Sequence, residues 1–290
     1  MQIKGVKIKI HPTFIVLLLL LFFSGLGLRA LLVFLLVILH ELAHTLAAVG
    51  YGVKVKSLEL YPYGGTAVFE DTFEGNRIEE SVIAFAGPAL NLAIFFGLQY
   101  LRWLGLIDGD WVLELLKVNF WLACFNLIPV LPLDGGRIAR AFLARTFGFV
   151  QITKFLAACG KWLGGLFVIL GFVLQALGFF IYEPGLFLVL GVFFLIGSSK
   201  EEQNARIVFL KQLCRKKEQL LRQGLMRGSS LTVAPDTPLG KLIDQLSTDR
   251  YCLINIIGQK DKIEKVLSES ELVQGMIDYG LDYPVGKLLS

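Results

Sequence analysis

Apolar residues in this chain gather into long runs that are separated by short polar connections. An apolar run of about 18 or more residues can cross the hydrocarbon core of a bilayer as a helix. Six runs are predicted to be transmembrane helices, the last of them short: 12–28, 30–49, 80–101, 111–131, 158–181 and 184–199. The pattern therefore predicts a polytopic α-helical membrane protein with six spans.

Basic residues are concentrated in every second connection. The N-terminal segment carries Lys4, Lys7 and Lys9, the connections after the second and fourth spans are basic, and the tail is rich in Lys and Arg. The other connections carry a single arginine or no basic residue. Because loops rich in Lys and Arg stay in the cytoplasm, both termini are predicted to be cytoplasmic.

Two segments on this cytoplasmic side alternate between apolar and polar residues with the period of a β-strand. They are residues 6–10 and 53–60, and the second reaches a Pro/Gly turn at 61–65 and returns through 66–69. The pattern predicts a small β-sheet at the membrane edge. This sheet could accept an extended substrate segment by strand addition, or the hairpin could lie on the lipid headgroups. The sequence leaves both alternatives open.

The composition changes from apolar to charged and mixed after residue 199. Residues 198–223 are predicted to form a basic amphipathic helix near anionic lipid, and Gly224 is predicted to end it. The remainder is predicted to be an α+β unit with helices at 238–246 and 270–279 and strands at 251–257 and 263–267. The predicted organisation is a membrane domain over 1–199, a linker helix over 200–224 and a cytoplasmic domain over 225–290.

The overall composition agrees with a membrane protein. Of the 290 residues, 55% are hydrophobic and 18% are charged, whereas soluble domains have about 25% charged residues. No small-residue cleavage site follows the first apolar run, so that run is predicted to be a span and not a cleaved signal. No basic block interleaved with aromatic residues indicates direct nucleic-acid binding. The four cysteines lack metal-ligand spacing and are interpreted as buried or free thiols.

The candidate chemistry begins with His40, Glu41 and His44, which form an HExxH pattern within the second predicted span. Two histidines four residues apart on a helix are separated by about 40° around its axis, so both rings can bind one zinc ion. Glu41 is the only charged residue between Arg29 and Lys54. Such groups are costly in a bilayer unless they are paired or bind a metal. The alternative is a structural hydrogen-bond cluster or a proton relay.

A hydrolytic zinc site needs a third protein ligand and an open position for water. Asp134 is the predicted third ligand of one zinc ion per chain, because the prolines and glycines around it interrupt the fourth span and can bend the carboxylate inward. The predicted topology brings Asp134 to the same side of the membrane as His40 and His44. The remaining histidine, His11, is interpreted as an interfacial residue. The alternative for Asp134 is a helix-terminating turn residue paired with Arg137.

In the predicted reaction, zinc activates a water and polarises the scissile carbonyl. Glu41 is the predicted catalytic residue, which takes the proton of the water and gives it to the leaving amine. Asn126 is predicted to bind the substrate backbone or the developing oxyanion from a position two helical turns above Asp134. Asn91 is a weaker substrate-binding candidate, because a buried asparagine can instead tie helices together.

Three motifs together resemble the site-2 protease family of intramembrane zinc metalloproteases. They are HELAH at 40–44, FAGPALN at 85–91 and NLIPVLPLDGGR at 126–137, and the resemblance covers most of residues 1–200. It implies a zinc ion held by His40, His44 and Asp134, with Glu41 catalytic. The implied activity is that of a metalloendopeptidase cutting a membrane-associated substrate near the cytoplasmic face.

The tail resembles a single cystathionine-beta-synthase-type (CBS) domain, through the segment LTVAPDTPL at 231–239 and the strands and helix after it. This resemblance implies ATP or another adenine nucleotide as a ligand, and a homo-oligomer in which two copies pair. Six spans with one CBS unit resemble the sporulation branch of the family. That branch implies a membrane-tethered pro-sigma factor of the pro-sigma-K type as substrate and inhibitory membrane proteins as partners. The implied location is the bacterial inner membrane or the membrane surrounding a forespore.

Two other functions are compatible with parts of the sequence. A transporter or channel gated by a nucleotide-sensing domain should place ionisable residues along several spans, whereas the first, fifth and sixth predicted spans contain almost none. A metal-binding scaffold without proteolytic activity could use the same three metal ligands.

Overall fold

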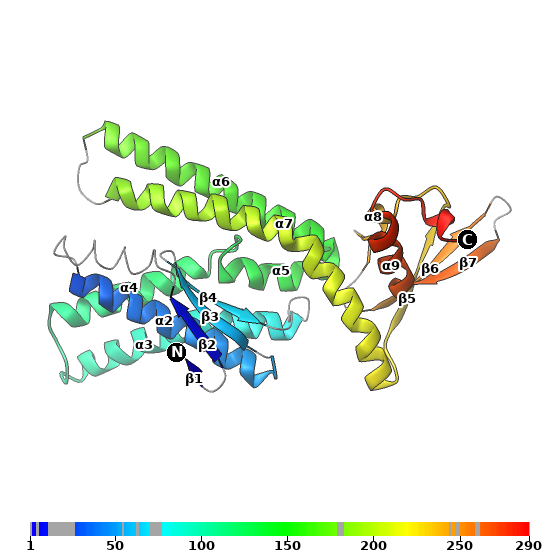
Figure 1. Ribbon diagram of the computed structural model, residues 1–290. Coiled ribbons are helices and arrows are strands. Elements are labelled where there is room, and N and C mark those ends of the chain that lie inside the picture. Colours follow the sequence, from blue (N-terminus) through cyan, green and yellow to red (C-terminus); the bar gives the residue numbers. More distant parts are fainter. Residues whose placement is uncertain are drawn as a thin grey trace.

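The computed structural model describes residues 2–3, 6–10, 27–53, 55–61, 64–69, 77–178, 183–243, 245–246, 250–258 and 262–289. Within these residues, a helical part with a small β-sheet is followed by a C-terminal α+β unit, and one long helix joins the two (Figure 1).

The helical part contains α2 (Gly27–Gly50), α3 (Arg77–Trp103), α4 (Asp110–Asn126), α5 (Asp134–Phe147), α6 (Phe149–Ala176) and α7 (Glu183–Gln223). Three of the described helices are long and apolar enough to cross a membrane, over Leu31–Gly50, Ile78–Trp103 and Phe149–Ala176. These three candidates overlap the second, third and fifth predicted spans. Many of their large apolar side chains are exposed, as expected for helices that face lipid.

Several predicted boundaries were wrong. The fourth predicted span does not continue to residue 131, because α4 ends at Asn126 and residues 127–133 are not helical. The two prolines in that segment lack the amide hydrogen that a helix needs. The fifth span was predicted from residue 158, but α6 begins at Phe149. Its first turns bury one face in the protein and expose the other, so they lack the uniform apolar character of a span.

Other predicted features of the membrane domain are tested only in part. The sixth predicted span is the first part of α7, which continues without a break to Gln223. Residues 200–223 are therefore helical, as predicted, but they are not a separate element. Most of the first predicted span lies outside the described residues, as does His11. The count of six spans and the cytoplasmic position of both termini remain predictions.

The predicted small sheet is present, while its position at the membrane edge stays a prediction. Its strand order is β1 (Gln2–Ile3), β2 (Val6–Ile10), β3 (Val55–Tyr61) and β4 (Gly64–Phe69). Strands β2 and β3 are parallel, and β3 and β4 form an antiparallel hairpin. In Figure 1 the sheet lies beside α2, the helix that carries the HExxH motif. Because β4 is an edge strand of the sheet, the strand-addition hypothesis remains possible.

A buried ion cluster joins three helices of this part. Arg140 on α5 is 1% exposed, and its guanidinium lies 2.7 Å from Glu80 Oε1 on α3 and 3.2 Å from Glu201 Oε2 on α7. The guanidinium also lies over the Phe149 ring, with its central carbon 5.0 Å from the ring centroid. The cluster therefore holds α5, whose first residue is Asp134, against the helix that leads to the C-terminal unit.

The C-terminal unit contains β5 (Gly228–Val233), α8 (Leu239–Ile243), β6 (Tyr251–Ile257), β7 (Ile263–Ser268), α9 (Glu269–Tyr279) and η1 (Val285–Leu289). Its sheet has the order β5-β6-β7, with β5 parallel and β7 antiparallel to β6. The predicted strands and the second predicted helix are confirmed, while the first predicted helix is shorter than expected and β5 was missed. Gly224, with φ of 74°, follows the end of α7 as predicted.

The C-terminal unit and the end of the helical part share one apolar core. Phe149 of α6 and Phe209 and Leu213 of α7 belong to the same buried cluster as Ile254 of β6. Lys216 of α7 donates to Glu269 Oε1 at 2.8 Å. Burial raises the pKa of the Glu269 carboxyl above its ordinary value, and the nearby Lys216 ammonium opposes that shift. The last turns of α7 are therefore packed into the C-terminal unit and are not a free linker.

We expect the substitution Arg140→Met to lower the free energy of unfolding by about 3–5 kcal/mol, because it removes the guanidinium that lies 2.7 Å from the fully buried Glu80 carboxylate. Thermal unfolding of the purified protein in detergent measures the loss. The matched control is Arg102→Met, because Arg102 pairs with the exposed Asp108 and its loss should leave the melting temperature unchanged. Equal melting temperatures for Arg140→Met and the wild type would contradict a stabilising role for the cluster.

Candidate metal centre

His40 and His44 lie one helical turn apart on α2, and their rings meet at one point. The two Nε2 atoms are 3.1 Å apart. Both side chains are buried. Residues four positions apart occupy the same face of a helix, so the sequence spacing brings both rings to one side of α2.

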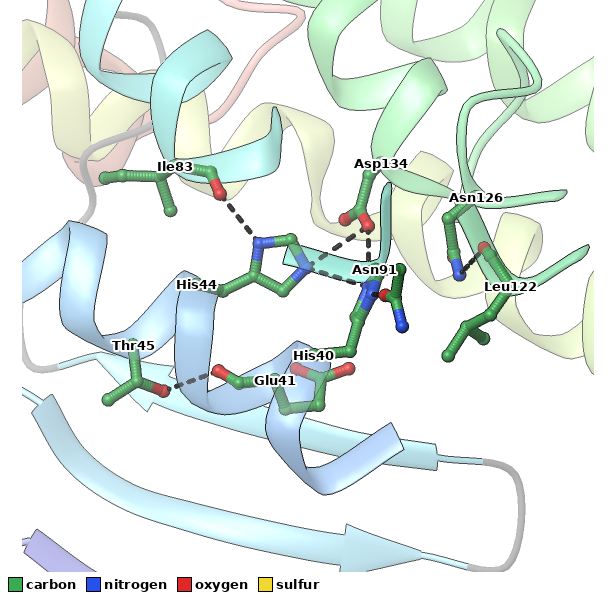
Figure 2. Close-up of polar contacts among 9 residues, drawn as sticks. All are labelled: His40, Glu41, His44, Thr45, Ile83, Asn91, Leu122, Asn126 and Asp134. Atoms are coloured by element: carbon green, nitrogen blue, oxygen red, sulfur yellow. Dashed lines mark hydrogen bonds and ion pairs between the residues drawn. The ribbon is translucent and has the colours of Figure 1, made fainter. Parts of the chain in front are cut away.

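Asp134, the first residue of α5, completes the cluster. Its Oδ2 atom lies 3.2 Å from Nε2 of His40 and 3.2 Å from Nε2 of His44, so the three donor atoms form a nearly equilateral triangle (Figure 2). Ligand distances of about 2.0–2.2 Å in a tetrahedral zinc site place neighbouring donor atoms about 3.3–3.6 Å apart, close to the separations seen here. The three side chains therefore fit a zinc ion and leave its fourth tetrahedral position to another ligand.

Hydrogen bonds on the far side of each ring orient the imidazoles. Nδ1 of His44 donates to the backbone oxygen of Ile83 at 2.7 Å, and Nδ1 of His40 donates to Oδ1 of Asn91 at 2.5 Å. Both acceptors come from α3, which packs beside α2. With the proton on Nδ1, each ring turns the lone pair of Nε2 toward Asp134, as a zinc ligand must.

Close packing of α3 against the rings depends on Gly87. A β-carbon at this position would lie 2.4 Å from His44 Nε2 and 2.6 Å from His40 Nε2, which no real side chain could do. A glycine is therefore required where α3 passes over the two imidazoles. Gly135 has the same role in the first turn of α5, because a β-carbon there would lie 2.2 Å from the backbone oxygen of Leu127.

Glu41 follows His40 on α2 and is half-buried. Figure 2 shows its side chain extending from the helix beside His40. Thr45 Oγ1 donates to the backbone oxygen of Glu41 at 2.9 Å, and this bond does not involve the Glu41 carboxylate. A carboxylate that adjoins a metal ligand can reach a water at the metal, which is the position of a general base.

The two asparagines predicted to bind substrate have different surroundings. Asn126 is half-buried at the end of α4, and its Nδ2 donates to the backbone oxygen of Leu122 at 2.9 Å. The expectation that a helix carries it two turns above Asp134 was wrong, because the non-helical segment 127–133 separates the two residues. Asn91 is fully buried, with its Oδ1 on His40 and its Nδ2 on Asn119. Its amide is therefore occupied by protein groups, in agreement with the alternative in which it ties helices together.

Gly87, Asn119 and the Ile83 carbonyl were not predicted as parts of this centre. Gly87 lies within the FAGPALN motif, and Asn119 is a polar residue in an apolar span, so both had a signal in the sequence. The Ile83 carbonyl had no such signal, because every residue has a backbone carbonyl.

A buried HExxH helix and a carboxylate from a second segment, set among apolar helices, define the class of an intramembrane metalloprotease. The chain belongs to the site-2 protease type of peptidase family M50. Residues 28–104 and 111–170, which include all three candidate ligands, match the model of Peptidase family M50.

Similar proteins support this assignment. The solved structure of the site-2 protease from Methanocaldococcus jannaschii is 30% identical and superposes with a TM-score of 0.56, covering 70% of this chain and 93% of that one. The zinc metalloprotease MJ0392 of the same species is 29% identical over an alignment of 269 residues, which covers 86% of this chain and 72% of the relative. Stage IV sporulation protein FB of Bacillus subtilis is 32% identical over 146 residues, which are 49% of this chain and 50% of the relative.

The chain is therefore a zinc-dependent metalloendopeptidase of the intramembrane type and an integral multi-pass membrane protein. This finding confirms the predicted enzyme and favours it over the transporter.

We expect Gly87→Ala to weaken zinc binding by about 10-fold or more, because the added methyl group displaces both imidazoles. Competition with a chromogenic chelator measures the affinity. Gly97→Ala is the matched control on the same helix, since a β-carbon there meets nothing within 4 Å. The steric assignment fails if Gly87→Ala binds zinc as tightly as Gly97→Ala.

Proposed function

We propose that this protein cleaves membrane-tethered proteins near the cytoplasmic face, with His40, His44 and Asp134 holding one zinc ion and Glu41 acting as the general base. The observation that carries the proposal is the triangle of donor atoms with edges of 3.1–3.2 Å. Bound zinc supplies Lewis acidity that activates water and polarises a carbonyl. The remaining steps belong to side chains of this protein.

Glu41 accepts the proton of the attacking water and returns it to the amine that leaves when the peptide bond breaks. Hydrogen bonds to α3 orient both histidine rings, and Oδ2 of Asp134 lies 3.2 Å from each Nε2 atom. Asn126 binds the substrate backbone or the developing oxyanion beside Asp134. An extended substrate segment reaches the centre by pairing with β4, an edge strand of the sheet beside α2.

The natural substrate that we propose is a membrane-tethered pro-sigma factor of the pro-sigma-K type. The support is the resemblance of the spans and tail to the sporulation branch, together with the similarity to stage IV sporulation protein FB. On the same grounds we propose the bacterial inner membrane, or the membrane surrounding a forespore, as the location, and inhibitory membrane proteins as partners.

For the C-terminal unit we propose a CBS-type domain over residues 225–290 that binds ATP or another adenine nucleotide and pairs with a second copy. The order strand, helix, strand, strand, helix from β5 to α9 supports this proposal. Helix α7 provides a route for regulation, because it contacts Glu269 of the C-terminal unit through Lys216 and Arg140 of α5 through Glu201.

We expect Glu41→Gln to reduce cleavage by a factor of about 10²–10⁴, since the amide cannot accept a proton from water. The measurement is the rate of cleavage of a co-purified membrane-tethered pro-protein, with zinc content determined on the same sample. Zinc content should remain unchanged, because Glu41 is not a ligand, whereas His44→Ala should lose both zinc and activity. A chelator should abolish wild-type cleavage and added zinc should restore it. Normal cleavage by Glu41→Gln would refute the assignment of the base.

We expect the cleavage rate of the full-length protein to change with ATP concentration. GTP at the same concentration is the control for a general effect of nucleotide charge. Glu201→Gln weakens the contact between α7 and Arg140. This variant should still bind ATP, but its cleavage rate should change less with ATP concentration than that of the wild type. A cleavage rate that does not vary with ATP would contradict nucleotide regulation while leaving the protease assignment intact.

A further inference from the structure

A series of hydrogen bonds behind the metal centre begins at a backbone carbonyl of α4 and ends at His40. Asn119 Nδ2 donates to the backbone oxygen of Leu115 at 2.9 Å, and Asn91 Nδ2 donates to Asn119 Oδ1 at 2.9 Å. Asn91 Oδ1 then contacts Nδ1 of His40 at 2.5 Å. Both asparagines are fully buried, so no water competes for these contacts. We call these four groups the asparagine series.

The direction of every bond in the asparagine series follows from its first member. A carbonyl oxygen can only accept, so the atom of Asn119 that faces Leu115 must be the NH₂ group. The other end of the Asn119 carboxamide is then its oxygen, which requires the NH₂ group of Asn91. The oxygen of Asn91 consequently faces His40, and the proton of the His40 ring must lie on Nδ1.

This direction matters because His40 has a competing arrangement. If the ring carried its proton on Nε2, that N–H would point at Asp134 Oδ2, which is 3.2 Å away, and the two would form an ordinary hydrogen bond. Nε2 could not then bind a metal ion. The partner of His44 Nδ1 is the backbone oxygen of Ile83, which can only accept, so the proton of His44 stays on Nδ1. The partner of His40 Nδ1 is the side-chain amide of Asn91, which could rotate by 180° and present its NH₂ group instead.

We propose that Asn119 is a positioning residue for zinc: through the orientation of the Asn91 amide it holds the proton of His40 on Nδ1 and keeps Nε2 available to the metal. The inference rests on the proposed assignment of His40 as a ligand. Within the described residues, the hydrogen bonds of Asn119 go to Leu115 and Asn91 and not to a candidate ligand. Its action depends on one property, which is the ability to present an acceptor to Asn91 and a donor to Leu115.

The decisive experiment combines two substitutions. Asn119→Leu removes both functions of the amide, so the Asn91 amide loses its fixed orientation, and we expect zinc affinity to fall by about 10- to 100-fold. In Asn91→Asp both carboxylate oxygens accept, so orientation no longer matters. We therefore expect Asn91→Asp to restore most of the affinity when it is added to Asn119→Leu. If the losses of zinc affinity caused by Asn119→Leu and by Asn91→Asp simply add in the double variant, the proposal is overturned.

A second measurement reports the proton directly. In metal-free protein labelled with ¹⁵N at its three histidines, the ring nitrogen shifts distinguish Nδ1–H from Nε2–H. We expect His40 to carry Nδ1–H in the wild type and to shift toward Nε2–H in Asn119→Leu, with His44 unchanged. An unaltered His40 signal in Asn119→Leu would also overturn the proposal, and this measurement does not depend on activity.

Two controls separate this inference from the proposed function. Asn126→Leu is the same substitution on the same helix, and we expect it to leave zinc affinity and the His40 signal unchanged. His40→Ala should abolish zinc binding. If His40→Ala retains zinc, the proposed metal site is wrong; if His40→Ala loses zinc while Asn119→Leu binds it normally, only the role of Asn119 is wrong.

Discussion

The structure of the membrane domain depends on one close contact, in which two imidazoles of α2 and the Asp134 carboxylate of α5 meet among apolar helices. Groups of this kind are costly in a low-dielectric interior unless each polar atom has a partner. Helix α3 supplies two of the partners, since Ile83 and Asn91 accept from the outer ring nitrogens. Gly87 of the same helix allows the close approach that these bonds require.

The position of Asp134 depends in turn on the segment that precedes it. Residues 127–133 are not helical, and Ser198 Oγ of α7 donates to the backbone oxygen of Leu131 at 2.7 Å. Arg140, further along α5, is held between Glu80 and Glu201. Helix α7 therefore contacts both ends of the region that presents the carboxylate, and its last turns enter the core of the C-terminal unit. Packed contacts therefore run from the C-terminal unit through α7 to the segment that precedes Asp134 and to the helix that begins there.

Sequence patterns predicted the elements well where a single physical rule applies. Long apolar runs predicted α2, α3 and α6, because only a helix satisfies its own backbone in lipid. A period of two predicted strands β2, β3 and β4 of the four-stranded sheet. Boundaries were wrong where two environments meet. Helix α6 begins at Phe149, where Phe149 and Val150 pack into the core shared with the C-terminal unit and Ile152 and Leu156 pack against Leu131. These first turns are buried in protein on one face, so their composition is mixed and unlike that of a span.

The sequence by itself determined the chemistry of the centre. Two histidines four residues apart must share a helix face, and a zinc site needs a third ligand, for which Asp134 was the carboxylate that the broken fourth span could present. Only the tertiary structure decided how those ligands are oriented. The His40 ring is held by Asn91, which is 51 residues away, and Asn91 is held by Asn119 on another helix. The direction of a hydrogen bond depends on which groups meet after packing, and a carbonyl such as that of Ile83 is the same in every residue.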